Sequence, residues 1–307
     1  MPRPLVECVP NFSEGRRPEI LAGLAAAVRG VPGVRLLDVS ADPDHNRAVF
    51  TIIGGPEAVY EAAYRSAAAA VAALDLRTHT GVHPRIGAVD VVPFVPLYAA
   101  SLAECVALAR RLGESLATRF DLPVYLYAAA ASDPARRTLA AIRRSGFEWL
   151  HAAISAPDRR PDFGPARVHP TAGAVAVGAR DILIAMNVDL DSTDLSAARK
   201  IARAVRESSG GLPAVQAMGV TLSSRGRVQV SMNLLDYRRT SPAAAFERVR
   251  EEAARLRIAV AAGELIGCAP ADALPPDPIQ TLRLRTLRPE QILHPAALAR
   301  ELGGPAP

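Results

Sequence analysis

The order of strands and helices expected along the first hundred residues is the strongest constraint on the fold. Apolar, β-branched runs predict strands, and apolar residues recurring every three or four positions predict helices. Prolines and glycines separate these segments. The resulting order is β-α-β-β-α-β, the arrangement of a ferredoxin-like domain. The expected strands are 5–10, 34–39, 48–53 and 89–97, the last ending at one of its prolines, and the expected helices are 18–28 and 54–76.

The C-terminal part of the chain repeats this order. We therefore expect an α+β fold of two ferredoxin-like (βαββαβ) subdomains, with helices on one face of each sheet, which indicates an internal duplication although the halves share no residue-level identity. We assign residues 1–178 to the N-terminal subdomain and 179–307 to the C-terminal subdomain with a short tail. The expected strands of the second half are 181–188, 215–222, 228–234 and 258–266, and its expected helices are 195–206 and 242–256.

The composition excludes several classes of protein. Of the 307 residues, 50% are hydrophobic and 22% charged, as in an ordinary soluble globular protein. Aromatic residues make up 5% and no polybasic block occurs, so we expect no nucleic-acid partner. The net charge of +5 suits an anionic small molecule, although a solvated surface explains it almost as well. The three scattered cysteines argue against disulfides and a cysteine-based zinc site. We expect a cytoplasmic protein without a signal peptide or membrane span.

The segment from Arg77 to Leu97 is the part of the chain that most resembles a site for chemistry. His79 and His83 lie on an irregular, Gly- and Pro-containing stretch that leads into the expected core strand with Asp90. A metal site would need further ligands that the sequence does not place, so we interpret His79 as a surface residue and expect no metal. His83 lies between Gly and Pro, next to Arg85, and is suited to proton transfer near pH 7.

Four motifs, in this order along the chain, resemble those of the glutamate formimidoyltransferase family, the formiminotransferase domain of formimidoyltransferase-cyclodeaminase. The resemblance covers residues 5–274, and we expect a monofunctional transferase without the cyclodeaminase domain. It implies two ferredoxin-like subdomains with a folate-binding tunnel between them, and a homodimer. The motifs are Val6-Glu-Cys-Val-Pro-Asn-Phe-Ser-Glu-Gly15, His83-Pro-Arg-Ile-Gly-Ala-Val-Asp90, Val124-Tyr-Leu-Tyr127 and Pro161-Asp-Phe-Gly-Pro165.

The same resemblance implies a reaction and its site. The formimino group of N-formimino-L-glutamate would pass to N5 of tetrahydrofolate, a co-substrate, in a step of histidine breakdown. The histidine of the Gly-x-His-Pro-Arg motif, here His83, would be the general base and then the general acid. The segment that would contact folate aligns with Asp162, Phe163, Gly164, Pro165, Ala166, Arg167, Val168, His169, Pro170 and Thr171.

The charged hairpin tip and the His83 segment supply further candidates for binding the substrate or its tetrahedral intermediate. Arg47 or Arg85 could pair with a substrate carboxylate, although ordinary structural ion pairs explain both arginines equally well. Asp38 or Asp42 could stabilise the amine nitrogens of the intermediate, and Asn46 lies in the same tip. Where relatives of this family carry an acidic residue two positions after Asp38, this chain has Ser40, so the supporting carboxylate is left open between the two aspartates.

Two other functions fit the same residues. One is a transferase that moves a formyl group on the same folate, and the other is a folate-binding protein without activity. His83 favours an enzyme over a binding protein but does not separate the two donors. Folate binding without turnover would identify the binding protein.

Overall fold

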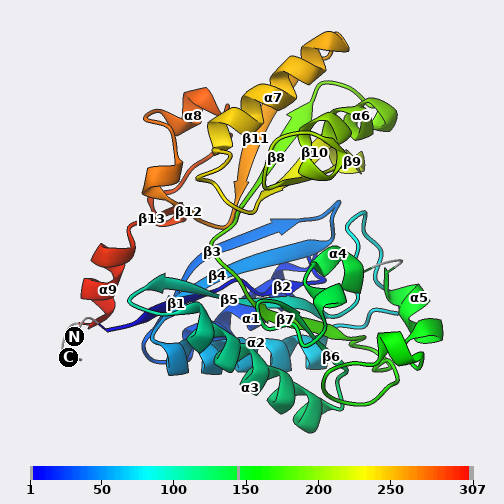
Figure 1. The fold of residues 1–307 in the computed structure, drawn as a ribbon, viewed down its shortest axis with the longest axis vertical. Helices are drawn as coiled ribbons and strands as arrows, with labels where there is room; N and C mark the ends of the chain where they lie inside the picture. The colour runs from blue at the N-terminus through cyan, green and yellow to red at the C-terminus, as the bar shows by residue number, and fades with distance from the viewer. Residues whose placement is uncertain (1–2, 144–145, 304–307) are drawn as a thin grey trace. The chain divides into compact units, whose positions relative to one another are not determined.

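The chain divides into two compact units (Figure 1). The structure is a computed structural model that describes residues 3–143 and 146–303. The N-terminal unit runs to Arg180 and includes the C-terminal segment from Pro295, whereas the C-terminal unit is Asp181–His294. The division expected from the sequence differs at the tail, because helix α9 (Pro295–Gly303) groups with the N-terminal unit. An ion pair between Glu301 and Arg35 links α9 to the N-terminal unit.

The N-terminal unit is built on a mixed, seven-stranded sheet. Strands β3, β4, β1 and β5 lie side by side and are antiparallel, and β2 also pairs with both β4 and β5. Strands β7 and β6 extend the sheet in parallel beyond β5. The strands are β1 (Leu5–Cys8), β2 (Asn11–Phe12), β3 (Val34–Asp42), β4 (Arg47–Gly54), β5 (Val89–Tyr98), β6 (Val124–Ala128) and β7 (Val175–Ala179).

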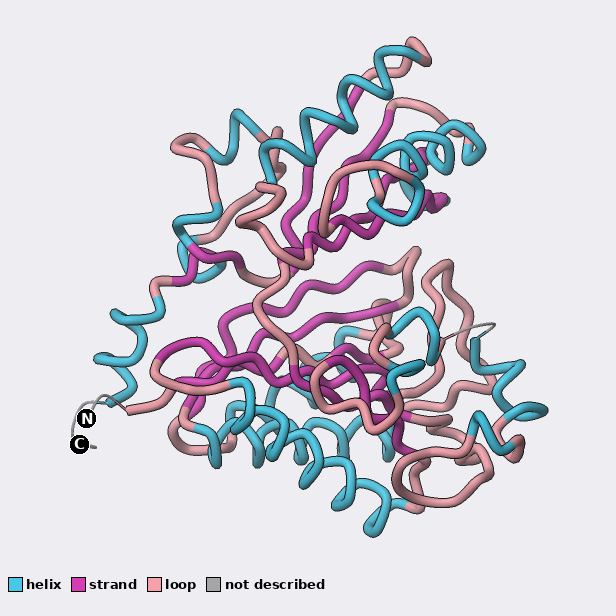
Figure 2. The backbone as a smooth tube through the Cα atoms, in the orientation of Figure 1, coloured by secondary structure: helices cyan, strands magenta, loops and turns pink. Residues whose placement is uncertain are grey.

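Three long helices cover one face of this sheet: α1 (Pro18–Arg29), α2 (Pro56–Ala73) and α3 (Leu102–Phe120) (Figure 2). The core between helices and sheet includes Phe12 and Phe50, whose rings meet edge to face with centroids 5.0 Å apart. Two shorter helices, α4 (Leu139–Ile142) and α5 (Gly146–Ala153), bury Ile142, Phe147 and Leu150 in a second cluster with residues of β5, β6 and β7.

The face of the sheet opposite the three long helices carries polar residues. Side chains alternate along a strand, so the neighbours of the core residues Val6 and Cys8 point the other way. Glu7 therefore lies on this opposite face, where it pairs in register with Ile53. Asp38 pairs with Thr51 on the same face. Glu7 and Asp38 are 4% and 3% exposed, so this face holds buried acidic groups.

Strand β5 continues through both of its prolines, contrary to the expectation that it would end at one of them. A proline in a strand removes a backbone donor but keeps its acceptor. The carbonyl of Pro93 still accepts from Val9 N at 3.2 Å, and the carbonyl of Phe94 accepts from Arg180 N at 3.1 Å. Pairing through carbonyls on both sides of the strand therefore compensates for the missing donors.

The C-terminal unit has a four-stranded antiparallel sheet in the order β11-β8-β10-β9. Helices α6 (Leu195–Val205) and α7 (Pro242–Arg255) contribute to its hydrophobic core. A short parallel pair and a small helix follow. The strands are β8 (Ile184–Leu190), β9 (Val215–Leu222), β10 (Arg227–Leu234), β11 (Val260–Ile266), β12 (Ala269–Pro270) and β13 (Ile292–Leu293), and the small helix is α8 (Pro278–Thr281).

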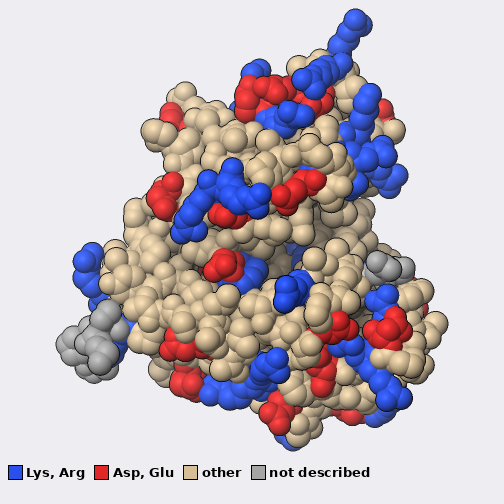
Figure 3. All heavy atoms as spheres, in the orientation of Figure 1, with Lys and Arg blue, Asp and Glu red and all other residues tan. Residues whose placement is uncertain are grey.

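The α+β class is therefore confirmed, with sheets and helices in both units. Acidic and basic side chains are interspersed on the visible surface (Figure 3). None of the helices within residues 3–143 and 146–303 is both long enough and apolar enough to cross a membrane.

A substitution at Gly87, just before β5, tests how tightly the segment with His83 is packed. A Cβ at Gly87 would lie 1.8 Å from the carbonyl oxygen of Ala174, a backbone atom that cannot move without disturbing the sheet. We expect Gly87→Ala to lower the free energy of unfolding by more than ~3 kcal/mol. Gly23→Ala is the matched control, because a Cβ there meets nothing within 4 Å and Gly23 lies inside α1. Gly23→Ala should stabilise by about 0.5–1 kcal/mol. Denaturant unfolding measures both values, and equal effects would contradict the packing argument.

Glu7 predicts a pH dependence of stability. Burial raises its pKa from 4.5 to about 7, and the charge of Arg180 offsets this only in part. Between these pH values the unfolded chain loses the proton that the folded chain keeps, so this contribution to stability falls as the pH rises. Glu7→Gln removes the titration. The free energy of unfolding of Glu7→Gln, measured relative to the wild type, should therefore rise by about 3 kcal/mol between pH 4.5 and pH 8. If the difference in unfolding free energy between the variant and the wild type stays constant with pH, the raised pKa of Glu7 is refuted.

Candidate active site

Three segments meet at one end of the N-terminal sheet: the turn after β2, the tip of the β3–β4 hairpin at 42–47, and residues 77–88 before β5. Asn46 joins all three. Its side-chain oxygen accepts from Gly15 N at 3.0 Å, and its side-chain nitrogen donates to the carbonyl of Thr80 at 2.9 Å. Asn46 therefore holds the loops together, whereas the sequence had offered it as a substrate contact.

Asn46 also positions His79. Its backbone has a φ of 47°, a left-handed conformation that asparagine tolerates better than most residues. The carbonyl of Asn46 lies 2.8 Å from Nε2 of His79, and because a carbonyl only accepts, Nε2 carries the proton. Burial lowers the pKa of His79. His79 is thus a half-buried, neutral brace between two loops, rather than the surface residue that the sequence indicated.

Two glycines allow the loops to approach each other this closely. A Cβ at Gly81 would lie 2.4 Å from the carbonyl oxygen of His45, and a Cβ at Gly15 would lie 2.2 Å from that of Asp42. Real Cβ atoms do not approach backbone oxygens at these distances. The hairpin tip therefore packs between two chain segments that must be bare of side chains at the points of contact.

His83 has one ring nitrogen fixed and the other available. Its Nδ1 lies 2.8 Å from the carbonyl oxygen of Pro84, so Nδ1 is the protonated nitrogen of the neutral ring. Nε2 then carries the lone pair and is the atom that can accept a proton. The side chain is half-buried, and the ring of His45 lies nearby with centroids 5.8 Å apart.

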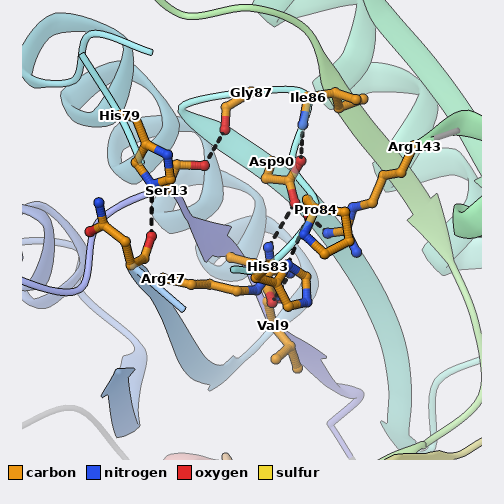
Figure 4. Close-up of polar contacts among 12 residues, drawn as sticks. Val9, Ser13, Arg47, His79, His83, Pro84, Ile86, Gly87, Asp90 and Arg143 are labelled. Carbon is orange, nitrogen blue, oxygen red and sulfur yellow. Dashed lines mark hydrogen bonds and ion pairs between the residues drawn. The ribbon is translucent and has the colours of Figure 1, made fainter. Parts of the chain in front are cut away.

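Next to His83, two arginines converge on one buried carboxylate (Figure 4). Arg47 and Arg143 both donate to Oδ2 of Asp90, Arg47 at 2.7 Å. The other oxygen of Asp90 accepts from Ile86 N at 2.8 Å. Burial opposes ionisation of Asp90, but the two guanidinium groups and the Ile86 N–H outweigh it and hold its pKa below the ordinary value. Burial, followed by the charge of Arg143, lowers the pKa of Arg47 to about 10, which still leaves it charged at neutral pH.

The surroundings of His83 keep its ring neutral. Burial lowers the pKa of His83 well below its ordinary value, and the positive charges of Arg47 and Arg143 and the nearby His45 lower it further. At neutral pH the ring is therefore in the form that can accept a proton. A neutral imidazole whose Nε2 carries the lone pair can act as a general base.

Arg85, the other arginine proposed from the sequence, has its partners in the loop before β5 and on helix α5. Its guanidinium donates to the carbonyl of His79 at 3.0 Å and to Glu148 at 2.9 Å, and it lies 5.8 Å from the ring centroid of Phe147. These contacts connect the loop before β5 to helix α5. In this structure Arg85 braces the loop, and Arg47 is the one that lies beside His83.

The two candidate carboxylates have different surroundings. Asp42 caps the hairpin tip, where its Oδ1 accepts from the backbone N–H groups of Asp44 at 2.8 Å and His45 at 2.9 Å. Asp38 is buried on the polar face of the sheet and accepts from the hydroxyl of Ser40 at 2.5 Å. Ser40 thus supports Asp38 through a hydrogen bond.

The first residues of the expected folate segment, 162–171, anchor it to β6. Oδ2 of Asp162 accepts from Leu126 N at 2.8 Å and from Arg136 at 2.9 Å. Phe163 pairs with Val124, whose N–H donates to the Phe163 carbonyl at 2.9 Å. The Asp162 and Phe163 contacts thus hold the segment in place.

The later residues of this segment are more exposed and lead back to the His83 segment. Gly164, Ala166, Arg167 and Pro170 are exposed, Pro165 and Thr171 are half-buried, and Val168 is buried. His169 uses Nδ1 to accept from Ala172 N at 2.9 Å, which shapes a turn. The carbonyl of Ala172 in turn accepts from Ala88 N at 2.9 Å. The structure therefore links the end of the segment to the chain that follows His83.

Sequence reasoning missed Arg143 and Asn11. Arg143 follows the four-residue helix α4, and nothing in its sequence neighbours indicates that it reaches Asp90. Asn11, whose Oδ1 accepts from Arg47, lies in the motif Val6–Gly15, in which the sequence had indicated no site residue. A buried aspartate in an otherwise apolar strand was a signal that a cationic partner must exist, without saying which.

Among residues 3–143 and 146–303, no group of three or more His, Cys, Asp or Glu side chains is placed to hold a metal ion. The candidate site is therefore assembled from a histidine, arginines, an aspartate and backbone groups. Such a set can transfer protons and bind anions.

Comparisons with known proteins identify the family of this chain. The model of the formiminotransferase domain, N-terminal subdomain, matches residues 5–180, and that of the formiminotransferase domain matches residues 185–276. The chain is 42% identical over 270 residues to glutamate formimidoyltransferase of Streptococcus pyogenes, covering 88% of this chain and 90% of that protein. It is 44% identical over 272 residues to glutamate formimidoyltransferase of Thermoplasma acidophilum, covering 88% and 89%.

A longer relative matches over part of its length. The formimidoyltransferase-cyclodeaminase of Mus musculus is 43% identical over 276 residues, which cover 88% of this chain and 51% of that protein. This chain thus spans about half of the mouse protein but nearly all of the two shorter relatives. On these matches, the chain belongs to the formiminotransferase family.

Proposed function

We propose that this protein is a glutamate formimidoyltransferase, which transfers the formimino group of N-formimino-L-glutamate to N5 of tetrahydrofolate and releases L-glutamate and 5-formiminotetrahydrofolate. The names of the two relatives that match over most of their length support this activity. The observation in the site that carries the proposal is the neutral His83, whose Nε2 is left as a proton acceptor.

His83 moves the proton in two steps. N5 attacks the amidine carbon, and Nε2 of His83 takes the proton that N5 loses, giving a tetrahedral intermediate. The resulting imidazolium then gives this proton to the glutamate nitrogen as its bond to that carbon breaks. The proton removed from one nitrogen is thus delivered to the other, and the ring returns to its neutral form.

We assign the carboxylate that supports the positive nitrogens of the intermediate to Asp38. Oδ1 of Asp42 already accepts two backbone N–H groups that shape the hairpin tip. Asp38 is held by the Ser40 hydroxyl on the polar face of the sheet. Of Arg47 and Arg85, Arg47 lies beside His83 and can attract a substrate carboxylate by its charge, although its terminal nitrogens already donate to Asp90 and Asn11. Arg85 pairs with Glu148.

Tetrahydrofolate is the co-substrate, and we propose that the segment 162–171 contacts it. Asp162 and Phe163 anchor the segment, and the exposed Ala166, Arg167 and Pro170 are available to a ligand. The buried cysteines Cys8, Cys105 and Cys268 form no disulfide among the described residues, which suits a protein of the cytoplasm. A homodimer follows from the resemblance to this family.

We also propose that both units are ferredoxin-like and arose by duplication. The strand order β3-β4-β1-β5 of the N-terminal unit has the same sequence of connections as β9-β10-β8-β11 of the C-terminal unit. In each unit the first and last strands of the βαββαβ order are neighbours. The N-terminal unit then adds α3, β6 and β7 to this plan.

His83→Ala should lower kcat for formimino transfer by 10²–10⁴-fold, since that is the range supplied by a positioned general base. The folate dissociation constant should change little. His294→Ala is the control, because His294 is exposed and lies outside the N-terminal sheet. A loss below tenfold would remove His83 from proton transfer. A wild type that is active only with a formyl donor would establish the formyl transferase, and one that binds folate without turnover would establish the binding protein.

The pH profile of kcat/KM tests the state of His83 in the free enzyme. Because burial and the arginines depress the pKa of His83, the neutral form persists as the pH falls. The acid limb of the profile should therefore lie below pH ~6.5, the ordinary pKa of histidine. The opposite result would be an acid limb at or above pH ~6.5 that is absent from His83→Ala. It would show that the ring of His83 is charged near neutral pH and would contradict the proposed neutral state.

A further inference from the structure

The cluster beside His83 carries more positive than negative charge. Arg47 and Arg143 share one carboxylate, that of Asp90. Asp90 is fully buried, and each arginine side chain is only 11% exposed. Two guanidinium groups and one carboxylate leave an excess of one positive charge in a place that water hardly reaches. A buried charge is normally paired, so this excess indicates a place for an anion.

Of the two arginines, Arg143 is the one with a buried hydrogen-bond donor that has no acceptor among the described residues. Arg47 donates from one terminal nitrogen to Asp90 and from the other to Asn11. Arg143 donates to Asp90 from one terminal nitrogen, and its buried Nε has no hydrogen-bond partner among the described residues. A guanidinium has five N–H groups in a planar fork that matches a carboxylate. Arg143 is therefore the group of the cluster that lacks a full set of acceptors.

The excess charge lies beside the group that moves the proton. Figure 4 shows His83, Arg47, Asp90 and Arg143 gathered at one place. An anion bound by Arg143 would consequently lie near the reacting atoms of the donor. In N-formimino-L-glutamate, the α-carboxylate is one carbon away from the nitrogen that leaves, whereas the side-chain carboxylate is three carbons away. The α-carboxylate is the one that fits a position close to His83.

We propose that Arg143 binds the α-carboxylate of the donor and so selects N-formimino α-amino acids. This inference rests on the proposed transfer activity and adds a specificity-determining residue to it. Binding would complete the hydrogen bonds of the Arg143 guanidinium and balance the charge of the cluster. It would also fix the amidine carbon relative to Nε2 of His83.

A comparison of two donors and two proteins tests the proposal. The donors are N-formimino-L-glutamate and N-formimino-4-aminobutyrate, which lacks only the α-carboxylate, and the proteins are the wild type and Arg143→Met. In the wild type, kcat/KM should favour the glutamate donor by about 10- to 100-fold, the range of a hydrogen-bonded ion contact. In Arg143→Met this preference should fall to about threefold or less, with the KM for tetrahydrofolate unchanged. Arg137→Met, at an exposed arginine on the same stretch, should keep the wild-type preference.

A preference for the glutamate donor that survives in Arg143→Met would overturn the proposal, because a merely structural arginine would slow both donors equally. If Arg143→Met does not fold, inhibition of the wild type decides instead. L-glutamate should then inhibit at least tenfold more strongly than 4-aminobutyrate, and equal inhibition would refute the subsite.

A wild type that turns over neither donor would refute the transfer activity. Calorimetric binding of L-glutamate that is lost in Arg143→Met would still support the subsite.

Discussion

The buried carboxylate of Asp90 is the interaction on which the candidate site depends. It holds the guanidinium groups of Arg47 and Arg143, and through Ile86 N it also holds the backbone three residues after His83. Breaking a buried ion pair by removing one partner costs about 3–5 kcal/mol, because the other charge remains in a place without water. Here two such charges share the partner. Asp90 therefore determines both the position of His83 and the positive electrostatic field that Arg47 and Arg143 create around it.

In the transfer that we propose, this field would act in opposite ways on the two halves of the reaction. A depressed pKa makes His83 a weaker base, which would be a cost in taking the proton from N5. The same positive charges make the imidazolium a stronger acid, so it gives the proton readily to the departing glutamate nitrogen. An anion held by Arg143 would offset one positive charge when the donor is bound. The ring would then be a better base in the presence of substrate than in the free enzyme.

The sequence allowed much of the architecture to be predicted but only part of the site. Periodicity and Gly/Pro punctuation located the strands and helices of both units, because these patterns depend on local chain geometry. His83 was predicted for the same reason, since its neighbours define an irregular stretch before a core strand. Arg143 was not, because it is 53 residues from Asp90 and the contact depends on how a short helix packs. The ion pair of Arg85 with Glu148 could not be predicted either, because adjacency to His83 in the sequence does not set the direction of a side chain.

The C-terminal unit contains a similar cluster in a different environment. Asp189 accepts from Gln229 at 2.7 Å and pairs with Arg225 and Arg285, so it too combines one buried carboxylate with two arginines. These arginine side chains are 29% and 37% exposed, against 11% for Arg47 and Arg143. Water therefore screens the excess charge in the C-terminal unit, and the only histidine within this unit is the exposed His294. The same kinds of charged residue can thus influence the proposed proton transfer in the N-terminal unit, where the sheet and loops exclude water and place an imidazole beside them.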